Sequence, residues 1–133
     1  ALQIKRGDPL IACKLAASLK MAGDEREAEK TLSLVKLTPR ESGSDLPLAL
    51  AQICFDAGLY DGAAKFLRGW LRVVKPFEAD ERKRAFVKLA LAQTYERMGE
   101  LEEAIDIYTE LLSSKEELIR SAARERLKEL TEE

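Results

Sequence analysis

The stretch Leu91–Leu111, with the sequence LAQTYERMGELEEAIDIYTEL, decides the fold of this chain. Apolar and small residues recur in it at intervals of three and four, which is the spacing of one face of an α-helix. Gly99 interrupts the pattern, and glycine favours a helix end because it adopts left-handed backbone angles without a steric penalty. The stretch therefore predicts a helical hairpin, two amphipathic helices joined by a tight turn.

Two further copies of this pattern lie upstream and are centred on Gly23 and Gly58. Each copy has a leucine-alanine pair before its glycine and an alanine five residues after it. Such small residues let the backbones of two helices approach closely, while larger neighbours fill the space beside them. The aligned residues are Leu15-Ala16, Leu50-Ala51 and Leu91-Ala92 before the glycines, and Ala28, Ala63 and Ala104 after them.

The pattern resembles the tetratricopeptide repeat, a helix-turn-helix unit of about 34 residues. The resemblance implies an all-α fold, a right-handed superhelical stack of antiparallel helical hairpins. Two features depart from the family: the tryptophan expected early in each unit is absent, and the third copy lacks a closing proline. The third copy is the nearest match and carries Leu91-Ala92, Tyr95, Gly99, Ala104, Tyr108 and Leu111.

We expect the 133 residues to form a single domain. It comprises three repeats, at about 9–40, 44–76 and 78–113, and a capping helix at 115–131 that covers the last repeat. The segment Ala1–Ile4 resembles the tail of a preceding repeat, although a disordered terminus is an equal alternative. We therefore expect this domain to be part of a longer protein. The seven predicted helices span 9–22, 25–37, 46–57, 60–74, 78–98, 101–113 and 115–131.

Composition excludes several classes of partner. The net charge of −2 and the fine mixing of acidic and basic residues do not form the basic surface that nucleic acid requires. The sequence has no apolar stretch of about 20 residues, so membrane insertion is not expected. Cys13 and Cys54 lie inside apolar helical patterns, which favours buried reduced thiols and a cytoplasmic location.

The sequence offers little for catalysis. It contains no histidine, which is the commonest general base and metal ligand. The two cysteines lack the CxxC spacing of zinc sites, and no glycine-rich phosphate-binding loop is present. Paired carboxylates near helix N-termini complement the helix dipole and require no catalytic role. We therefore expect no enzymatic activity, no cofactor and no bound metal.

The family resemblance implies that the first helices of successive repeats line a concave groove. We expect Leu48 and Leu89 to form an apolar floor beside Cys13, and Phe55 to act as an apolar anchor. The amides of the two groove glutamines can both donate to and accept from a peptide backbone. The predicted partner-binding residues are Lys20, Leu48, Gln52, Phe55, Leu89, Gln93, Glu96 and Arg97.

An alternative reading assigns these positions to ordinary packing. In that reading Leu48, Leu89 and Phe55 are partly buried packing residues, and the glutamines belong to the helix surface. Trp70 and Tyr60 are likewise interpreted as packing residues of second helices. Some family members clamp the C-terminal carboxylate of heat-shock chaperones with asparagine and basic residues, but this chain has no asparagine, so that clamp is not expected.

The sequence thus predicts a non-enzymatic scaffold or adaptor that binds a protein or peptide segment in the groove. One alternative is a structural or assembly module that forms a homo-oligomer or continues a longer superhelix. A second alternative is a regulatory domain of a larger protein.

Overall fold

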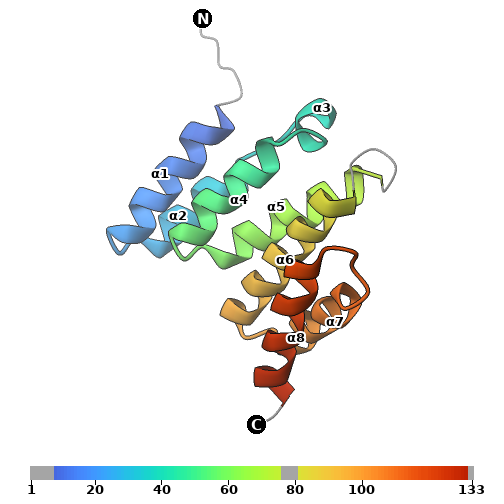
Figure 1. The fold of residues 1–133 in the computed structure, drawn as a ribbon. Coiled ribbons are helices and arrows are strands. Elements are labelled where there is room, and N and C mark those ends of the chain that lie inside the picture. The colour runs from blue at the N-terminus through green and yellow to red at the C-terminus, as the bar shows by residue number, and fades with distance from the viewer. Residues whose placement is uncertain (1–7, 76–80, 132–133) are drawn as a thin grey trace, which may run out of the picture. The chain divides into compact units, whose positions relative to one another are not determined.

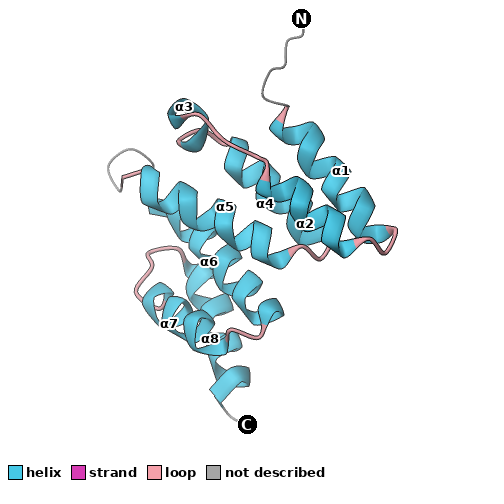
Figure 2. Ribbon diagram, turned by 180° about the vertical axis from the view of Figure 1, so that it is seen from behind, coloured by secondary structure: helices cyan, strands magenta, loops and turns pink. Residues whose placement is uncertain are grey.

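The computed structural model describes residues 8–75 and 81–131. All regular structure within these residues is helical and comprises eight helices (Figure 2). The all-α fold of helical hairpins that the sequence predicts is therefore confirmed. The chain divides into two compact units, an N-terminal unit that extends to Trp70 and a C-terminal unit that begins at Leu71.

The N-terminal unit contains two hairpins. The first hairpin is α1 followed by α2, and α4 packs beside α1 (Figure 1). Helix α5 follows α4 through a tight turn, and its last three residues belong to the C-terminal unit. The helices are α1 (Pro9–Met21), α2 (Glu25–Ser33), α3 (Pro39–Ser42), α4 (Leu46–Asp56) and α5 (Tyr60–Val73).

The C-terminal unit is a hairpin followed by one more helix. Helix α8 packs mainly against α7 and also contacts α6, as expected for a capping helix. The predicted first turn of α6, at residues 78–80, lies outside the described residues, as does the segment Ala1–Ile4. The helices are α6 (Glu81–Met98), α7 (Leu101–Leu111) and α8 (Glu117–Thr131).

Helix α3 was not predicted, although its signal is present in the sequence. Thr38 accepts a hydrogen bond from the backbone of Glu41 at 3.1 Å, and the Glu41 carboxylate accepts one from the backbone of Thr38 at 2.9 Å. This reciprocal capping box, together with Pro39 in the first turn, starts a new helix. The predicted second helix, 25–37, instead ends at Ser33, where the Ser33 hydroxyl donates to the carbonyl of Lys30 at 2.7 Å.

The three aligned glycines end their helices in the same way. Gly23, Gly58 and Gly99 have φ values of 92°, 84° and 81°, in the left-handed region that favours glycine. In each case the next residue donates its backbone N–H to a carbonyl five positions earlier, at 2.8 to 2.9 Å. This is the Schellman pattern of hydrogen bonds, which satisfies carbonyls that the helix end would leave unpaired.

The aligned alanines belong to the buried core. All six are at most 3% exposed, as expected for small residues that lie between paired helices. Trp70 is also buried, as its interpretation as a packing residue requires. The buried alanines are Ala16 and Ala28, Ala51 and Ala63, and Ala92 and Ala104.

Candidate partner-binding surface

The N-terminal unit brings Lys20 of α1 close to the end of α4. A Cβ atom placed on Gly58 would lie 3.6 Å from Cε of Lys20, so the lysine stem covers the turn after α4. The Lys20 ammonium pairs with Glu25 at 3.1 Å. Because the Glu25 side chain is largely exposed, this ion pair is weak and can exchange with another anion.

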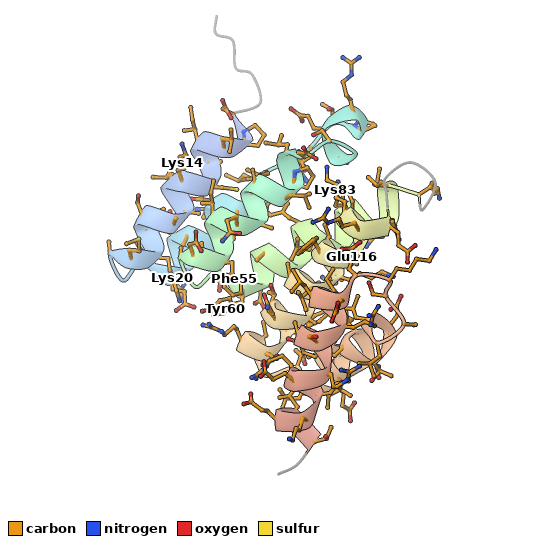
Figure 3. All side chains as sticks on the ribbon, in the orientation of Figure 1. Lys14, Lys20, Phe55, Tyr60, Lys83 and Glu116 are labelled. Atoms are coloured by element: carbon orange, nitrogen blue, oxygen red, sulfur yellow. The ribbon has the colours of Figure 1, made fainter. Side chains whose placement is uncertain are left out.

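Phe55 lies at the same end of α4 and is half-buried. Its ring packs edge-to-face against Tyr60 at the start of α5, with ring centroids 5.3 Å apart. Figure 3 shows Lys20, Phe55 and Tyr60 at one end of the N-terminal unit. The arrangement gives a partly accessible aromatic pair with a cation beside it, which can receive an apolar side chain next to an acidic group.

Gln52 lies one turn before Phe55 on α4 and is exposed. Its side-chain amide donates to the carboxylate of Asp56 at 2.9 Å, within the same helix. The amide oxygen and its second N–H keep the capacity to bond a peptide backbone. Leu48, one turn further back, is half-buried, so its position is compatible with both the groove and the packing interpretation.

In the C-terminal unit Glu96 does not project freely from α6. Its carboxylate, only 15% exposed, accepts two hydrogen bonds from Arg126 of α8, at 2.6 Å from Nη2 and 3.1 Å from Nε. The hydroxyl of Tyr108 on α7 donates to the same carboxylate. Glu96 thus links α6, α7 and α8 by hydrogen bonds. Its negative charge is paired with the Arg126 guanidinium of the same chain.

The protonation of this network follows from its contacts. Burial raises the pKa of Glu96, but hydrogen bonds from Arg126 and Tyr108 outweigh burial and leave that pKa below its ordinary value. Burial and the hydrogen bond to Glu96 raise the pKa of Tyr108. At neutral pH the network therefore consists of a carboxylate, a guanidinium and a neutral phenol.

The remaining predicted residues of α6 differ in accessibility. Gln93 and Arg97 are exposed, whereas Leu89 is half-buried. Arg97 contributes a favourable charge to Glu96, because it follows that residue directly in the helix. The predicted surface therefore falls into two portions, one on each unit: Lys20, Leu48, Gln52 and Phe55 in the N-terminal unit, and Leu89, Gln93, Glu96 and Arg97 in the C-terminal unit.

Cys13 does not line the floor of a groove. It is fully buried in α1, and Cys54 of α4 is also fully buried. The prediction that both cysteines are buried thiols is confirmed, while the expected place of Cys13 beside a partner is wrong. The physical reason is that α1 packs against both α2 and α4, and Cys13 lies on the part of α1 that these contacts bury, where a thiol behaves as a small apolar group.

Sequence reasoning missed the contacts of Arg126. Glu96 and Arg126 are separated by 30 residues, and the register of the capping helix against the hairpin has no signature in the repeat pattern.

Within residues 8–75 and 81–131 no cluster of three or more histidine, cysteine or carboxylate side chains could hold a metal ion. Among the helices assigned in those residues, none combines the length and apolar character needed to cross a bilayer.

Comparisons with known proteins agree with this architecture. Residues 89–120 match the family model of the tetratricopeptide repeat. A search of curated proteins gave no significant match. Among solved structures, the N-terminal domain of stress-induced protein-1 (STI-1) from C. elegans is similar, with a TM-score of 0.52 and 14% identity over 88% of this chain and 92% of that one. At this identity the similarity concerns the fold alone. Residues 89–120 are therefore similar to a tetratricopeptide repeat, and the fold that contains them is a helical-repeat fold.

Proposed function

We propose that the protein is a non-enzymatic scaffold that binds a segment of another protein on the first-helix face of its N-terminal unit. The observation that carries this proposal is that Lys20 from α1 reaches the turn after α4, at the end of α4 where Phe55 packs on Tyr60. Helical-repeat proteins commonly use the stacked faces of successive helices as extended binding surfaces. The tetratricopeptide repeat at residues 89–120 supports the same class of function.

The surface suggests what kind of segment it binds. An aliphatic or aromatic side chain of the partner can pack against the half-buried ring of Phe55. Gln52 can hydrogen-bond the backbone of that segment, and Lys20 can pair with an acidic group beside the apolar residue. We therefore expect an extended or helical segment in which an apolar residue has an acidic neighbour.

The C-terminal portion contributes less directly to this proposal. Glu96 is held by Arg126 and Tyr108, so binding through its carboxylate requires that this network be broken. Gln93 is exposed on α6, and its amide can both donate and accept hydrogen bonds. The proposal therefore rests on Lys20, Gln52 and Phe55 of the N-terminal unit.

The test is a pull-down from native lysate with three forms of the chain. The wild type is compared with the double variant Phe55→Glu, Gln52→Ala, and with Leu118→Glu as the matched control. Leu118 on α8 is 77% exposed and belongs to the C-terminal unit, so its replacement adds the same charge at a residue that is not part of the proposed surface. Circular dichroism verifies that all three forms are folded.

The proposal requires that a protein be retained by the wild type and by Leu118→Glu but lost by the double variant. Retention of the same protein by the folded double variant would show that binding occurs elsewhere. A synthetic peptide from the retained protein then measures affinity, with loss of about tenfold or more expected for Phe55→Glu.

A second candidate function, an assembly module, is favoured by one specific observation. Leu15 is 52% exposed, whereas its equivalents in the later repeats, Leu50 and Leu91, are 0% and 5% exposed. Ile11, one turn before Leu15, is also exposed. A second copy of the chain or a preceding repeat could cover this face of α1 as later repeats are covered.

Self-association can be tested by sedimentation equilibrium of the wild type and of Leu15→Glu over a wide range of concentration. An average mass that rises with concentration, and that rises less in the variant, supports assembly through α1. A wild type that stays monomeric at every concentration excludes self-association. The exposed face of α1 would then favour the other alternative, a regulatory domain within a larger protein.

A further inference from the structure

Helix α5 carries three basic side chains on one exposed face. Lys65, Arg68 and Arg72 occupy positions i, i+3 and i+7, which lie above one another along a helix, and all three side chains are exposed. The only other charged residue of α5 is Asp61, in its first turn. Lys65, Arg68 and Arg72 thus form a face of single sign, which we call the basic face.

Helix α7 repeats this spacing with the opposite sign. Glu103, Asp106 and Glu110 also occupy positions i, i+3 and i+7, and their side chains are exposed. Helix α7 has one further carboxylate, Glu102, and contains neither lysine nor arginine. We call Glu103, Asp106 and Glu110 the acidic face. At a rise of about 1.5 Å per residue, each of the two faces extends over about 10 Å.

Most of these charges are not used in ion pairs of the chain itself. Glu110 pairs with Lys88 of α6, but its side chain stays 57% exposed, so it can also contact a second cation. No ion pair within residues 8–75 and 81–131 involves four of the six side chains, Lys65, Arg72, Glu103 and Asp106.

A face of single sign is unfavourable for an isolated helix. Like charges three or four residues apart repel each other and weaken the helix that carries them. Helix α2 avoids this repulsion, because Arg26 lies three residues before Glu29 and Glu27 three residues before Lys30. Helices α5 and α7 each keep one sign along the face. Opposite charges from outside the helix would offset the repulsion in both.

We propose that the basic face of α5 binds the acidic face of α7 in a second copy of the chain. Two such helices, side by side in the same direction, bring three opposite charges together because the spacings are identical. The net charge of −2 is small, so two copies do not repel each other strongly at a distance. The pairs are Lys65–Glu103, Arg68–Asp106 and Arg72–Glu110.

The association should be weak and sensitive to salt. Each exposed ion pair contributes little, and two helix faces form a smaller contact than the interface of a stable dimer. We therefore expect a Kd on the order of several hundred micromolar at low ionic strength. Because salt screens exposed charges, this Kd should rise about tenfold or more when sodium chloride is increased from about 20 mM to about 500 mM.

Sedimentation equilibrium at both salt concentrations tests this expectation, with protein at up to about 500 μM. The average mass should rise with concentration at low salt and much less at high salt. Association through the apolar face of α1 would instead persist at high salt and would be abolished by Leu15→Glu. That variant should leave the contact between α5 and α7 unchanged. A wild type that stays monomeric at low salt would overturn the proposal.

Charge reversal tests the pairing of the two faces directly. The double variant Lys65→Glu, Arg72→Glu makes the basic face predominantly acidic, and Glu103→Lys, Asp106→Lys makes the acidic face predominantly basic. Each variant alone should be monomeric, because both of its faces then have the same sign. Circular dichroism verifies that both are folded, and Lys65→Glu alone takes the place of the first variant if that variant is unfolded.

Two recoveries should follow from these variants. An equimolar mixture of them should associate, because each variant then supplies the charge that the other lacks. The quadruple variant that combines all four substitutions should associate with itself. Its net charge is that of the wild type, so this recovery does not depend on overall charge. Absence of association in both the mixture and the quadruple variant would contradict the proposed pairing.

The matched control is the double variant Lys30→Glu, Lys128→Glu. Both lysines are exposed, on α2 and α8, and lie outside the two faces. The control has the same net charge as the α5 variant, −6 (−2 − 4). It should keep the Kd of the wild type within about threefold. A loss of association as complete as that of the α5 variant would mean that net charge governs the contact, and would overturn the proposal.

Discussion

Each unit of the chain includes a hairpin and a later helix that packs on its first helix, α4 on α1 and α8 on α6, yet the residues buried at the two contacts differ. In the N-terminal unit α4 packs on α1, and each of the two helices contributes one fully buried thiol, Cys13 and Cys54. In the C-terminal unit α8 meets α6 through a carboxylate and a guanidinium, Glu96 and Arg126. The turns and the alanine contacts inside the hairpins are shared.

This difference distinguishes the contacts within a hairpin from the contacts between a hairpin and the next helix. Contacts within a hairpin recur because backbone geometry at the turn and close helix packing demand particular residues. At the contact between a hairpin and the next helix, by contrast, any pair of side chains is suitable that fills the space and leaves no polar group unpaired. The apolar contact of α4 with α1 and the polar contact of α8 with α6 should therefore differ in how the stability of each unit responds to side-chain truncation, to loss of a charge and to pH.

The largest effect is expected from the apolar core of the N-terminal unit. Leu50→Ala in α4 removes a fully buried side chain and should lower the free energy of unfolding by about 2–5 kcal/mol. Leu15→Ala, at the equivalent position in α1, should cost under about 1 kcal/mol because Leu15 is half-exposed. Urea denaturation followed by circular dichroism measures both, and equal losses would contradict the difference in burial.

The polar joint should show a smaller and partly recoverable loss. Arg126→Met leaves the mostly buried Glu96 carboxylate without its guanidinium and should cost about 1–2 kcal/mol, a range lowered here because Arg126 is itself partly exposed. In the double variant Glu96→Leu, Arg126→Met no carboxylate is left unpaired, and we expect much of the loss to be recovered. A double-mutant cycle by urea denaturation provides the coupling energy, and strict additivity would argue against the ion pair.

The turns should give equal effects in both units, because their geometry is the same. Gly58→Ala and Gly99→Ala each place a Cβ atom on a backbone with positive φ, which should cost about 1 kcal/mol. No close contact adds to this strain, since the nearest atom to a Cβ at Gly58 is at 3.6 Å and none lies within 4 Å at Gly99. Unequal losses in denaturation would mean that the two turns differ in their surroundings.

The smallest effect concerns pH. The pKa of Glu96 is lower in the folded protein than its ordinary value of 4.5, so the unfolded chain binds a proton there more readily. The stability contributed by Glu96 is therefore complete above that ordinary value and is lost as the pH falls through the depressed pKa. Denaturation at pH 7 and pH 3 should show a smaller drop for Glu96→Gln than for the wild type. An identical drop in both proteins would indicate that the partners of Glu96 do not lower its pKa in the folded state.

Much of the fold was predictable because it depends on local rules. The three glycines, the leucine-alanine pairs and Asp8-Pro9 at the start of α1 each act through neighbouring residues, and the structure confirms them. The capping box at Thr38 was equally local and could have been recognised. The premature end of α2 is harder to anticipate, since it depends on competition between side-chain and backbone hydrogen bonds.

The candidate surface was predictable only in outline. Periodicity identifies one face of a helix but does not fix which edge of that face packs against the next helix. Cys13 is consequently buried in the core, where a partner cannot contact it. The contact of Glu96 depends on the register of α8, which carries no repeat signature. The role of Lys20, Gln52 and Phe55 in binding stays a prediction that the proposed variants can decide.

Trp70 provides the protein with an optical reporter of its own. It is the single tryptophan and is almost fully buried at the end of the N-terminal unit, so its fluorescence should shift to longer wavelength when its surroundings are exposed to water. Two of the three tyrosines, Tyr95 and Tyr108, are buried in the C-terminal unit. Selective excitation of tryptophan therefore follows one part of the chain, and tyrosine absorbance is weighted toward the other. Coincident transitions would mean that the units unfold as one cooperative block, and separate transitions would give each unit a stability of its own.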